Sequence, residues 1–166
     1  ALGGASWPKL GSRGEWTAHL AARGVETVPF QPMNMGFQVA WSAHMRPYFG
    51  HPLKSLALTA GSKSLRAEAM IVAKGLEGGG IYALSRQMRE GAALTLDLVP
   101  DLDRTEVQNR LAHGFARKDS VSNILRKALR LDGAKRALFF EMCKPLPASV
   151  EALAACLKAL PILHDG

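Results

Sequence analysis

The spacing of apolar residues changes near residue 100, and this change constrains the fold more than any other feature of the sequence. Before it, apolar residues alternate with polar ones over short stretches, which is typical of half-buried strands. After it, apolar residues recur three and four positions apart, which is typical of helices that bury one face. Strands followed by helices predict an α+β fold. We expect a small antiparallel β-barrel or curled sheet, which hides its edges, followed by a compact helical subdomain.

Alternating and β-branched stretches predict where the strands lie. We place strands at residues 25–30, 37–41, 56–58, 65–71 and 94–98. The first is stopped by Pro29 and Pro32, and the last puts Leu94, Leu96 and Leu98 on one face. A Gly-Ser turn separates the third and fourth stretches, so these two strands are expected to form a hairpin.

Helical spacing predicts six helices. We expect them at residues 14–23 and 76–91, and around apolar stripes at 107–115, 121–129, 138–142 and 150–160. Asp119 or Ser120 is expected to cap the 121–129 helix and Ser149 the last one, because their side chains accept backbone N–H groups. Gly91 and Gly133 are expected to end the second and fourth helices.

The first fourteen residues, ALGGASWPKLGSRG, combine glycines and serines around Pro8. Glycines let a backbone turn tightly and approach another surface closely, because no Cβ obstructs it. The segment LGGASWPKLGSRG resembles the pattern ATGG-S-(Y/W)P-x-x-GS-x-G of the YhiN/BaiN-like flavoproteins, a family of FAD oxidoreductases with two dinucleotide-binding domains. MNMGFQVAWSAHM, LEGGGIYALSRQMREGAALTLDLVPD and SVSNILRKALRL resemble the insert region of the same family.

The resemblance implies that this chain is the insert domain of such a flavoprotein, without the family's N-terminal GxGxxG segment and its C-terminal flavin segment. It implies four parts: residues 1–27 as a remnant of the FAD-binding domain, 28–100 as the β-rich barrel part of the insert, 101–160 as its helical part, and 161–166 as the start of the return to the FAD-binding domain. Carried over position by position, the family's flavin-contact segment falls on Gly3, Gly4, Ser6, Pro8, Gly11 and Ser12.

The resemblance also implies the chemistry of the parent protein, which would bind FAD noncovalently, use NAD(P)H as a redox partner and act on an unsaturated organic substrate. The insert would cover the flavin as a lid, shape the substrate cleft and have the remainder of the parent as its partner. Alone, this chain is expected to bind FAD weakly or not at all and to be inactive. Hydride chemistry would belong to the flavin, so we expect no catalytic and no metal-ligating residue here.

Basic residues concentrate in the helical half. The net charge is +7, and residues 103–144 hold ten Lys or Arg against five Asp or Glu. Such a surface suits phosphate-bearing partners, so the alternative function is a nucleic-acid-binding module. Its phosphate contacts would be Arg110, Arg117, Lys118, Arg126, Lys127, Arg130, Lys135 and Arg136. A solvated surface, or one that faces an acidic part of the parent, is the favoured explanation, and an oligomerisation surface is a third.

Other motifs exclude several classes. No GxSxG, HExxH or HxH is present, and only His44 and His51, seven apart around Tyr48-Phe49, suggest a shared face that a metal or acid–base role could use. Gly78–Gly80 before a helix could form an anion site, but a tight strand-to-helix turn is favoured. Cys143 and Cys156 lack metal-ligand spacing and are expected to be reduced, half-buried cytoplasmic thiols, and a bridge between them is the disfavoured alternative. No apolar run is long enough to span a membrane, and no signal peptide is recognisable.

Overall fold

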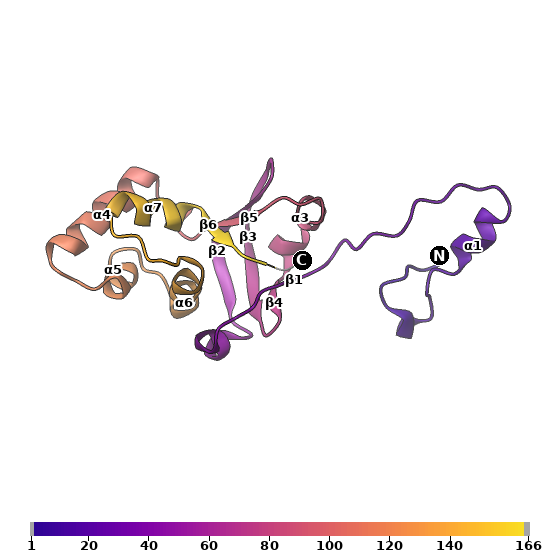
Figure 1. The fold of residues 1–166 in the computed structure, drawn as a ribbon, viewed down its shortest axis with the longest axis horizontal. Helices are drawn as coiled ribbons and strands as arrows, with labels where there is room; N and C mark the ends of the chain where they lie inside the picture. The colour runs from indigo at the N-terminus through magenta and orange to yellow at the C-terminus, as the bar shows by residue number, and fades with distance from the viewer. Residues whose placement is uncertain (1, 165–166) are drawn as a thin grey trace. The chain divides into compact units, whose positions relative to one another are not determined.

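The computed structural model describes residues 2–164, which divide into two compact units after Met33. The first unit is rich in loops and contains one 3-10 turn, η1 (Pro8–Leu10), and one short helix, α1 (Trp16–Ala21). The second unit contains the sheet and the remaining helices (Figure 1).

The second unit is built on one antiparallel sheet of six strands in the order β1-β4-β3-β2-β5-β6. The strands are β1 (Phe37–Gln38), β2 (Pro52–Ala60), β3 (Lys63–Val72), β4 (Gly75–Glu77), β5 (Leu94–Asp97) and β6 (Leu160–Ile162). The sheet curls into a half-barrel and is combined with several helices. The expected α+β fold with a curled antiparallel sheet is therefore confirmed.

The expected hairpin is the longest pairing in the sheet. β2 and β3 pair from Ala60↔Lys63 to Leu56↔Ala67, and the register then shifts at a bulge before Leu53. Ser55 lies in this bulge with φ of +51°, a left-handed conformation that costs free energy in a non-glycine residue. The bulge therefore has to be held by its surroundings.

Helices cover the sheet on both sides in Figure 1, with α4 to α7 gathered on one side and α3 on the other. Their bounds are η2 (Ala43–Tyr48), α2 (Gly79–Tyr82), α3 (Ser85–Arg89), α4 (Arg104–Ala116), α5 (Val121–Lys127), α6 (Gly133–Met142) and α7 (Val150–Lys158). Four of these helices begin at a side chain that accepts the backbone N–H three residues ahead, as N-caps do: Asp103, Ser120, Asp132 and Ser149. None of the helices among the described residues is long and apolar enough to cross a membrane.

The sheet and the helices share one core. Leu58 and Leu96 from the sheet, Leu111 from α4, Phe139 from α6 and Leu157 from α7 are all completely buried in the same cluster. Leu94, Leu96 and Leu98 face this core together, as their alternation predicted. Because the core is continuous, the barrel part and the helical part hold each other in place.

Residues 25–30 form no strand, so that prediction is wrong. Val25, Val28 and Phe30 are 48%, 84% and 49% exposed, and the residues around them are loop. A β-branched sequence becomes a strand when a neighbouring strand accepts it, and residues 2–33 contain no strand with which it could pair.

The helix expected over residues 76–91 is also different in the structure. Leu76 and Glu77 belong to β4, and the remainder divides into α2 and α3 at Leu84, whose φ of −105° and ψ of 0° are not helical. Ile81, Leu84 and Met88 are nevertheless buried, as predicted. The sheet takes the start of this segment because strand pairing with β3 satisfies its backbone groups.

Two further predictions about the helical half are corrected. Gly133 does not end a helix but begins α6, because Asp132 caps that helix and α5 already ends at Lys127. Leu160 is buried as expected, but it belongs to β6 rather than to the last helix, and it pairs with Leu96.

The two cysteines were expected to be reduced, and the structure instead joins Cys143 and Cys156 as a disulfide. Cys143 follows the last residue of α6 and Cys156 lies in α7. A bridge between them was the disfavoured alternative, because two cysteines 13 positions apart carry no motif that indicates pairing.

Candidate functional site

The glycine-rich opening closes on itself through the hydroxyl group of Ser12. Ser12 Oγ donates to Gly4 O at 2.7 Å and accepts the N–H of Gly14 at 3.3 Å. The indole Nε1 of Trp16 donates to Gly3 O at 2.9 Å. A Cβ on Gly3 would lie 2.5 Å from the Cβ of Ser12, so only glycine fits there.

These contacts shape a pocket of about 300 Å³, lined by Gly3, Gly4, Ser6, Trp7, Leu10 and Ser12. Four of the six positions that the resemblance assigns to flavin contact therefore line one pocket. The other two, Pro8 and Gly11, start and close the turn η1, where the Gly11 N–H donates to Pro8 O at 3.0 Å. No atom would lie within 4 Å of a Cβ on Gly4 or Gly11, so a ligand has room to approach the backbone at both.

Large apolar side chains of the first unit are strongly exposed. Trp7 and Leu10, beside the pocket, are 71% and 85% exposed, and Val28 and Met33 are 84% and 64% exposed. Trp7 and Leu10 line the same pocket and so form one apolar patch, and exposed patches of this kind mark interaction surfaces. The first unit therefore presents a surface suited to a further packing partner.

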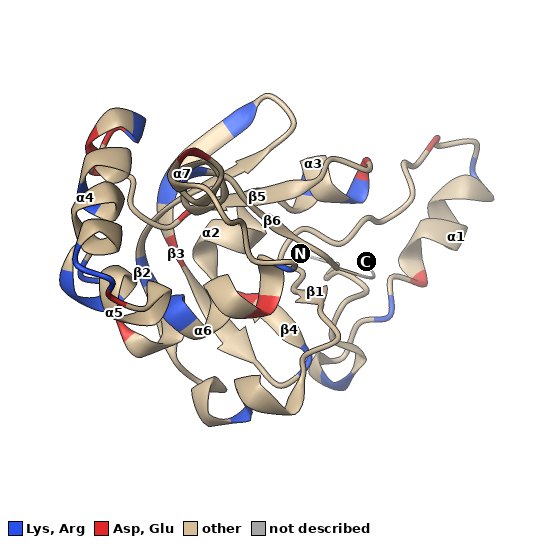
Figure 2. Cartoon of the chain, turned by 60° about the vertical axis from the view of Figure 1, so that its left-hand side comes forward, with Lys and Arg blue, Asp and Glu red and all other residues tan. Residues whose placement is uncertain are grey.

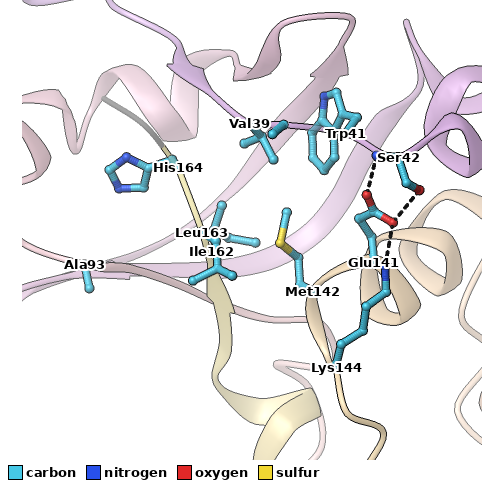
Figure 3. Close-up of a pocket in the computed structure, with 11 residues that line it drawn as sticks. Val39, Trp41, Ser42, Ala93, Glu141, Met142, Lys144, Ile162, Leu163 and His164 are labelled. Carbon is cyan, nitrogen blue, oxygen red and sulfur yellow. Dashed lines mark hydrogen bonds and ion pairs between the residues drawn. The ribbon is translucent and has the colours of Figure 1, made fainter.

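A second pocket lies in the other unit, where the two edges of the sheet approach each other. The rings of Phe37 in β1 and His164 after β6 are in edge contact, with centroids 5.1 Å apart. β1 ends at Gln38, and the next residue, Val39, donates its N–H to Lys74 O. A pocket of about 560 Å³ opens there (Figure 3). We call it the seam pocket.

The seam pocket has apolar walls. Figure 3 shows Val39 and Trp41 across from Ile162, Leu163 and Met142. Its lining comprises Val39, Ala40, Trp41, Ser42, Ala93, Glu141, Met142, Lys144, Ile162, Leu163 and His164. The indole of Trp41 is fixed, because its Nε1 donates to Val72 O at 2.8 Å.

Glu141 occupies one end of the seam pocket and is fully engaged. Its carboxylate accepts the N–H of Ser42 at 2.6 Å, the hydroxyl of Ser42 at 2.8 Å and the ammonium of Lys144 at 3.2 Å. Burial alone would raise the pKa of Glu141, but these bonds outweigh it and hold the pKa below its ordinary value of 4.5. Glu141 therefore joins α6 to the start of η2 as a charged acceptor.

His164 lies at the opposite end of the pocket, and its ring nitrogen Nδ1 is buried without a hydrogen-bond partner among the described residues. A buried polar atom without a partner costs free energy. Because this atom has almost no accessible surface, a ligand in the pocket gains a hydrogen bond to it when the ring of His164 turns to present Nδ1.

Figure 2 shows Lys and Arg segments on α4, α5 and α6, but the contacts of the basic residues that the nucleic-acid alternative names differ from one another. Lys135 is only 8% exposed, and its Nζ donates to Ser55 O and Leu98 O, both at 3.1 Å. Burial lowers the pKa of Lys135 below its ordinary value of 10.5, although Asp132, Asp101 and Asp97 raise it. Lys135 cannot reach a phosphate, so that assignment is wrong: it holds the bulge at Ser55.

Most of the other cations are engaged within the fold. Arg110 pairs with Glu106, Arg136 donates to Leu131 O, and Asp119 pairs with both Arg117 and Lys127. Within residues 2–164, no ion pair or side-chain hydrogen bond involves Lys118, Arg126 or Arg130. Three scattered cations are a smaller basic surface than the sequence suggested.

The remaining candidates of the sequence have structural roles. A Cβ on Gly80 would lie 2.6 Å from Glu68 O, so the glycines before α2 form the tight strand-to-helix turn that was favoured over an anion site. His51 packs its ring on Tyr48, with centroids 6.0 Å apart. Among the residues that the structure describes, no group of three or more His, Cys, Asp or Glu could hold a metal ion.

Sequence reasoning missed the seam pocket altogether. Trp41, Glu141 and His164 lie far apart in the chain and carry no shared motif. The one available signal was Trp41, which was predicted on a strand face but lies beyond the end of β1.

The comparison with known families agrees with this architecture. A family model described as the HI0933-like protein barrel and H2TH domain matches residues 31–166. No curated protein matches the chain. The matched range contains the whole sheet and the helices from η2 to α7. The chain therefore belongs to the HI0933-like family, within the YhiN/BaiN-like flavoproteins, and residues 31–166 are its barrel and H2TH domain.

Proposed function

We propose that this chain is the insert domain of an FAD-dependent, NAD(P)H-linked oxidoreductase, in which it covers the flavin and shapes the substrate cleft. The observation that carries the proposal is the family match, which spans the sheet and the helices that pack on it. The HI0933-like family is associated with flavoproteins, and the assignment of FAD follows from that association. The assignment of NAD(P)H as the redox partner rests only on the resemblance of the sequence to the flavoprotein family.

The residues of the first unit fit part of a flavin cofactor. The pocket of about 300 Å³ around Gly3, Gly4 and Ser12 is smaller than FAD, so it would hold one portion of the cofactor through backbone contacts. Bound FAD would supply the hydride chemistry. The role of this chain would be to position and enclose the cofactor, which excludes water from the reaction. Residues 1–27 are accordingly proposed as a part of the FAD-binding domain.

The exposed apolar surface of the first unit supports a partner for this segment. Trp7, Leu10 and Val28 would pack against the remainder of the parent flavoprotein rather than face water. The nucleic-acid alternative has no comparable support, because most of its proposed phosphate contacts are held by ion pairs or backbone carbonyls. We retain a cytoplasmic location as a prediction for the parent.

A flavin titration tests the proposal. The chain and a longer parent chain that includes the FAD-binding domain are each titrated with FAD while the visible absorbance spectrum is recorded. We expect tight binding by the longer chain and weak or no binding by this one. Tight binding by this chain alone would show that its first unit is a complete site, and binding by neither would overturn the flavoprotein assignment.

The lid role has a separate test in the parent. We expect deletion of residues 34–164, replaced by a short Gly-Ser linker, to leave flavin bound while turnover falls and substrate preference is lost. Unchanged turnover and preference after the deletion would refute the lid role. Flavin content, measured by absorbance after gel filtration, distinguishes this result from a failure to fold.

A further inference from the structure

We infer that the seam pocket binds a flat, mostly apolar organic molecule that carries one oxygen function, a hydroxyl or a carbonyl group. The site is formed by residues of the second unit only and is distinct from the glycine-rich pocket of the first. Binding itself does not depend on flavin. Only the further step, that this molecule is the substrate of the parent, rests on the proposed function.

The size of the pocket and its apolar walls favour a ligand with a flat, apolar ring system. A volume of about 560 Å³ is within the range of small-molecule sites. The indole of Trp41 is held in place by Val72 and offers a flat face on which a ring can stack. Leu163, on the opposite wall, is 71% exposed, so a bound ring would remove a large apolar side chain from water.

The polar groups of the pocket select a single oxygen function. Glu141 accepts hydrogen bonds from Ser42 and from the ammonium group of Lys144, so the two opposite charges at this end of the pocket are paired with each other (Figure 3). His164 Nδ1, at the other end, is the buried polar atom of the lining that has no partner among the described residues. The imidazole nitrogen can accept from a hydroxyl group or, when protonated, donate to a carbonyl group.

An added peptide strand fits the seam less well than a small molecule. Pro161 occupies the middle of the edge strand β6 and has no N–H to donate to a new strand. β1, the other edge, pairs over only two residues before the chain turns away. The seam therefore offers few backbone hydrogen bonds and a wide apolar recess, which favours a ligand bound by its surface and one polar contact.

The test uses this chain, labelled with ¹⁵N, and three probes: 2-naphthol, 2-acetylnaphthalene and, without oxygen, 2-methylnaphthalene. Each is titrated while the indole N–H signals of the three tryptophans are followed. We expect a saturable shift of the Trp41 signal, with a dissociation constant of about 10 μM to 1 mM for a ligand of this size. At least one oxygen-bearing probe should bind about fivefold more tightly than 2-methylnaphthalene, the gain of one hydrogen bond.

Two variants locate the site, and the spectrum of each reports whether it is folded. Ala93→Trp adds a ring at an exposed lining position and should abolish binding, whereas Lys54→Trp, exposed on β2 and outside the pocket, should not. His164→Phe keeps the ring contact with Phe37 and removes the nitrogen, so it should erase the preference for oxygen and leave 2-methylnaphthalene binding unchanged.

Three results would overturn the inference: no saturable shift with any probe, binding that persists in folded Ala93→Trp, or an oxygen preference that survives in His164→Phe. None of them bears on the flavin titration, which tests the proposed function separately. If the probes bind as expected but the parent binds no flavin, the seam pocket remains a binding site. Its assignment as the substrate site of a flavin enzyme would then be wrong.

Discussion

Glu141 shows how one carboxylate stabilises the boundary between the helical part and the start of η2. The side chain of Glu141 is 8% exposed and accepts three hydrogen bonds from Ser42 and Lys144. Because its pKa is lower in the folded state than in the unfolded chain, Glu141 stabilises the fold at every pH above its unfolded pKa. This contribution is lost as the pH falls below about 4.5 and through the folded pKa.

The first prediction concerns Glu141→Gln. At pH 7 we expect the free energy of unfolding to fall by about 1–2 kcal/mol, the difference between charged and neutral hydrogen bonds. The difference should shrink as the pH falls through the folded pKa of Glu141, because the carboxylate then becomes protonated in the folded state as well. Urea unfolding at a series of pH values below 7 measures this difference. A difference that does not depend on pH would contradict this role of the charge.

The second prediction concerns Lys135→Met. Methionine keeps the length and apolar part of the side chain but leaves the carbonyl groups of Ser55 and Leu98 without their donor. We expect a loss of about 1–3 kcal/mol in the free energy of unfolding. The matched control is Arg126→Met on the same basic half, which should be neutral within about 0.5 kcal/mol. Equal effects of the two substitutions would mean that the bulge does not need Lys135.

The sequence could not separate these residues from their neighbours. Lys135 appears among eight cations of the helical half, and only its position over the bulge at Ser55 makes it a buried donor. Glu141 meets Ser42 across 99 positions of chain. The positions predicted to contact flavin differ from both, because Gly3, Gly4 and Ser12 are close in sequence and their hydrogen bonds are local. A sequence motif can point to a local segment of this kind, whereas no motif pointed to the seam pocket.

At the scale of elements, Gly75 decides whether β1 can join the sheet. A Cβ at Gly75 would lie 1.9 Å from Phe37 O and 2.8 Å from Val39 N, and Gly75 has φ of +151°. The third prediction is that Gly75→Ala lowers the free energy of unfolding by about 2 kcal/mol or more, because the backbone of β1 must move away. Gly79→Ala, where no neighbour lies within 4 Å, is the control and should be neutral or slightly stabilising.

Urea unfolding compares the two glycine variants, and the Trp41 indole N–H signal reports on the strand. Because Trp41 follows β1 directly, its resonance should shift in Gly75→Ala and stay in place in Gly79→Ala. A Gly75→Ala protein as stable as the natural chain would show that β1 is not fixed by its pairing with β4.

Length determines which elements could be predicted. The long strands β2 and β3 and the stripes of α4 and α7 repeat their pattern often enough to be recognised. β4 and β6 are three residues each, too short to show a period, and the expected helices overlapped them at Leu76, Glu77 and Leu160. Their identity comes from pairing with β3 and β5, which is tertiary information.

At the scale of the molecule, the sequence predicted the α+β class and the curled antiparallel sheet, because both follow from the change of period near residue 100. The sequence did not predict that the sheet and the helices share a single core. Strand and helix stripes were each recognised as apolar, and the structure shows that Leu96, Phe139 and Leu157 belong to one cluster. The barrel and the helices should consequently unfold together in one transition.

The division after Met33 gives the last prediction. Among the described residues, every buried hydrophobic side chain lies at Phe37 or later, so the core of the second unit is complete without the first. We expect a chain of residues 34–166 to have the same free energy of unfolding in urea as residues 1–166, within about 0.5 kcal/mol. The longer chain should associate more readily, because Trp7 and Leu10 are exposed only there. Light scattering measures this association, and Trp7→Ser/Leu10→Ser in the longer chain should reduce it. A shorter chain that is unfolded, or several kcal/mol less stable, would show that the first unit is part of the same cooperative fold.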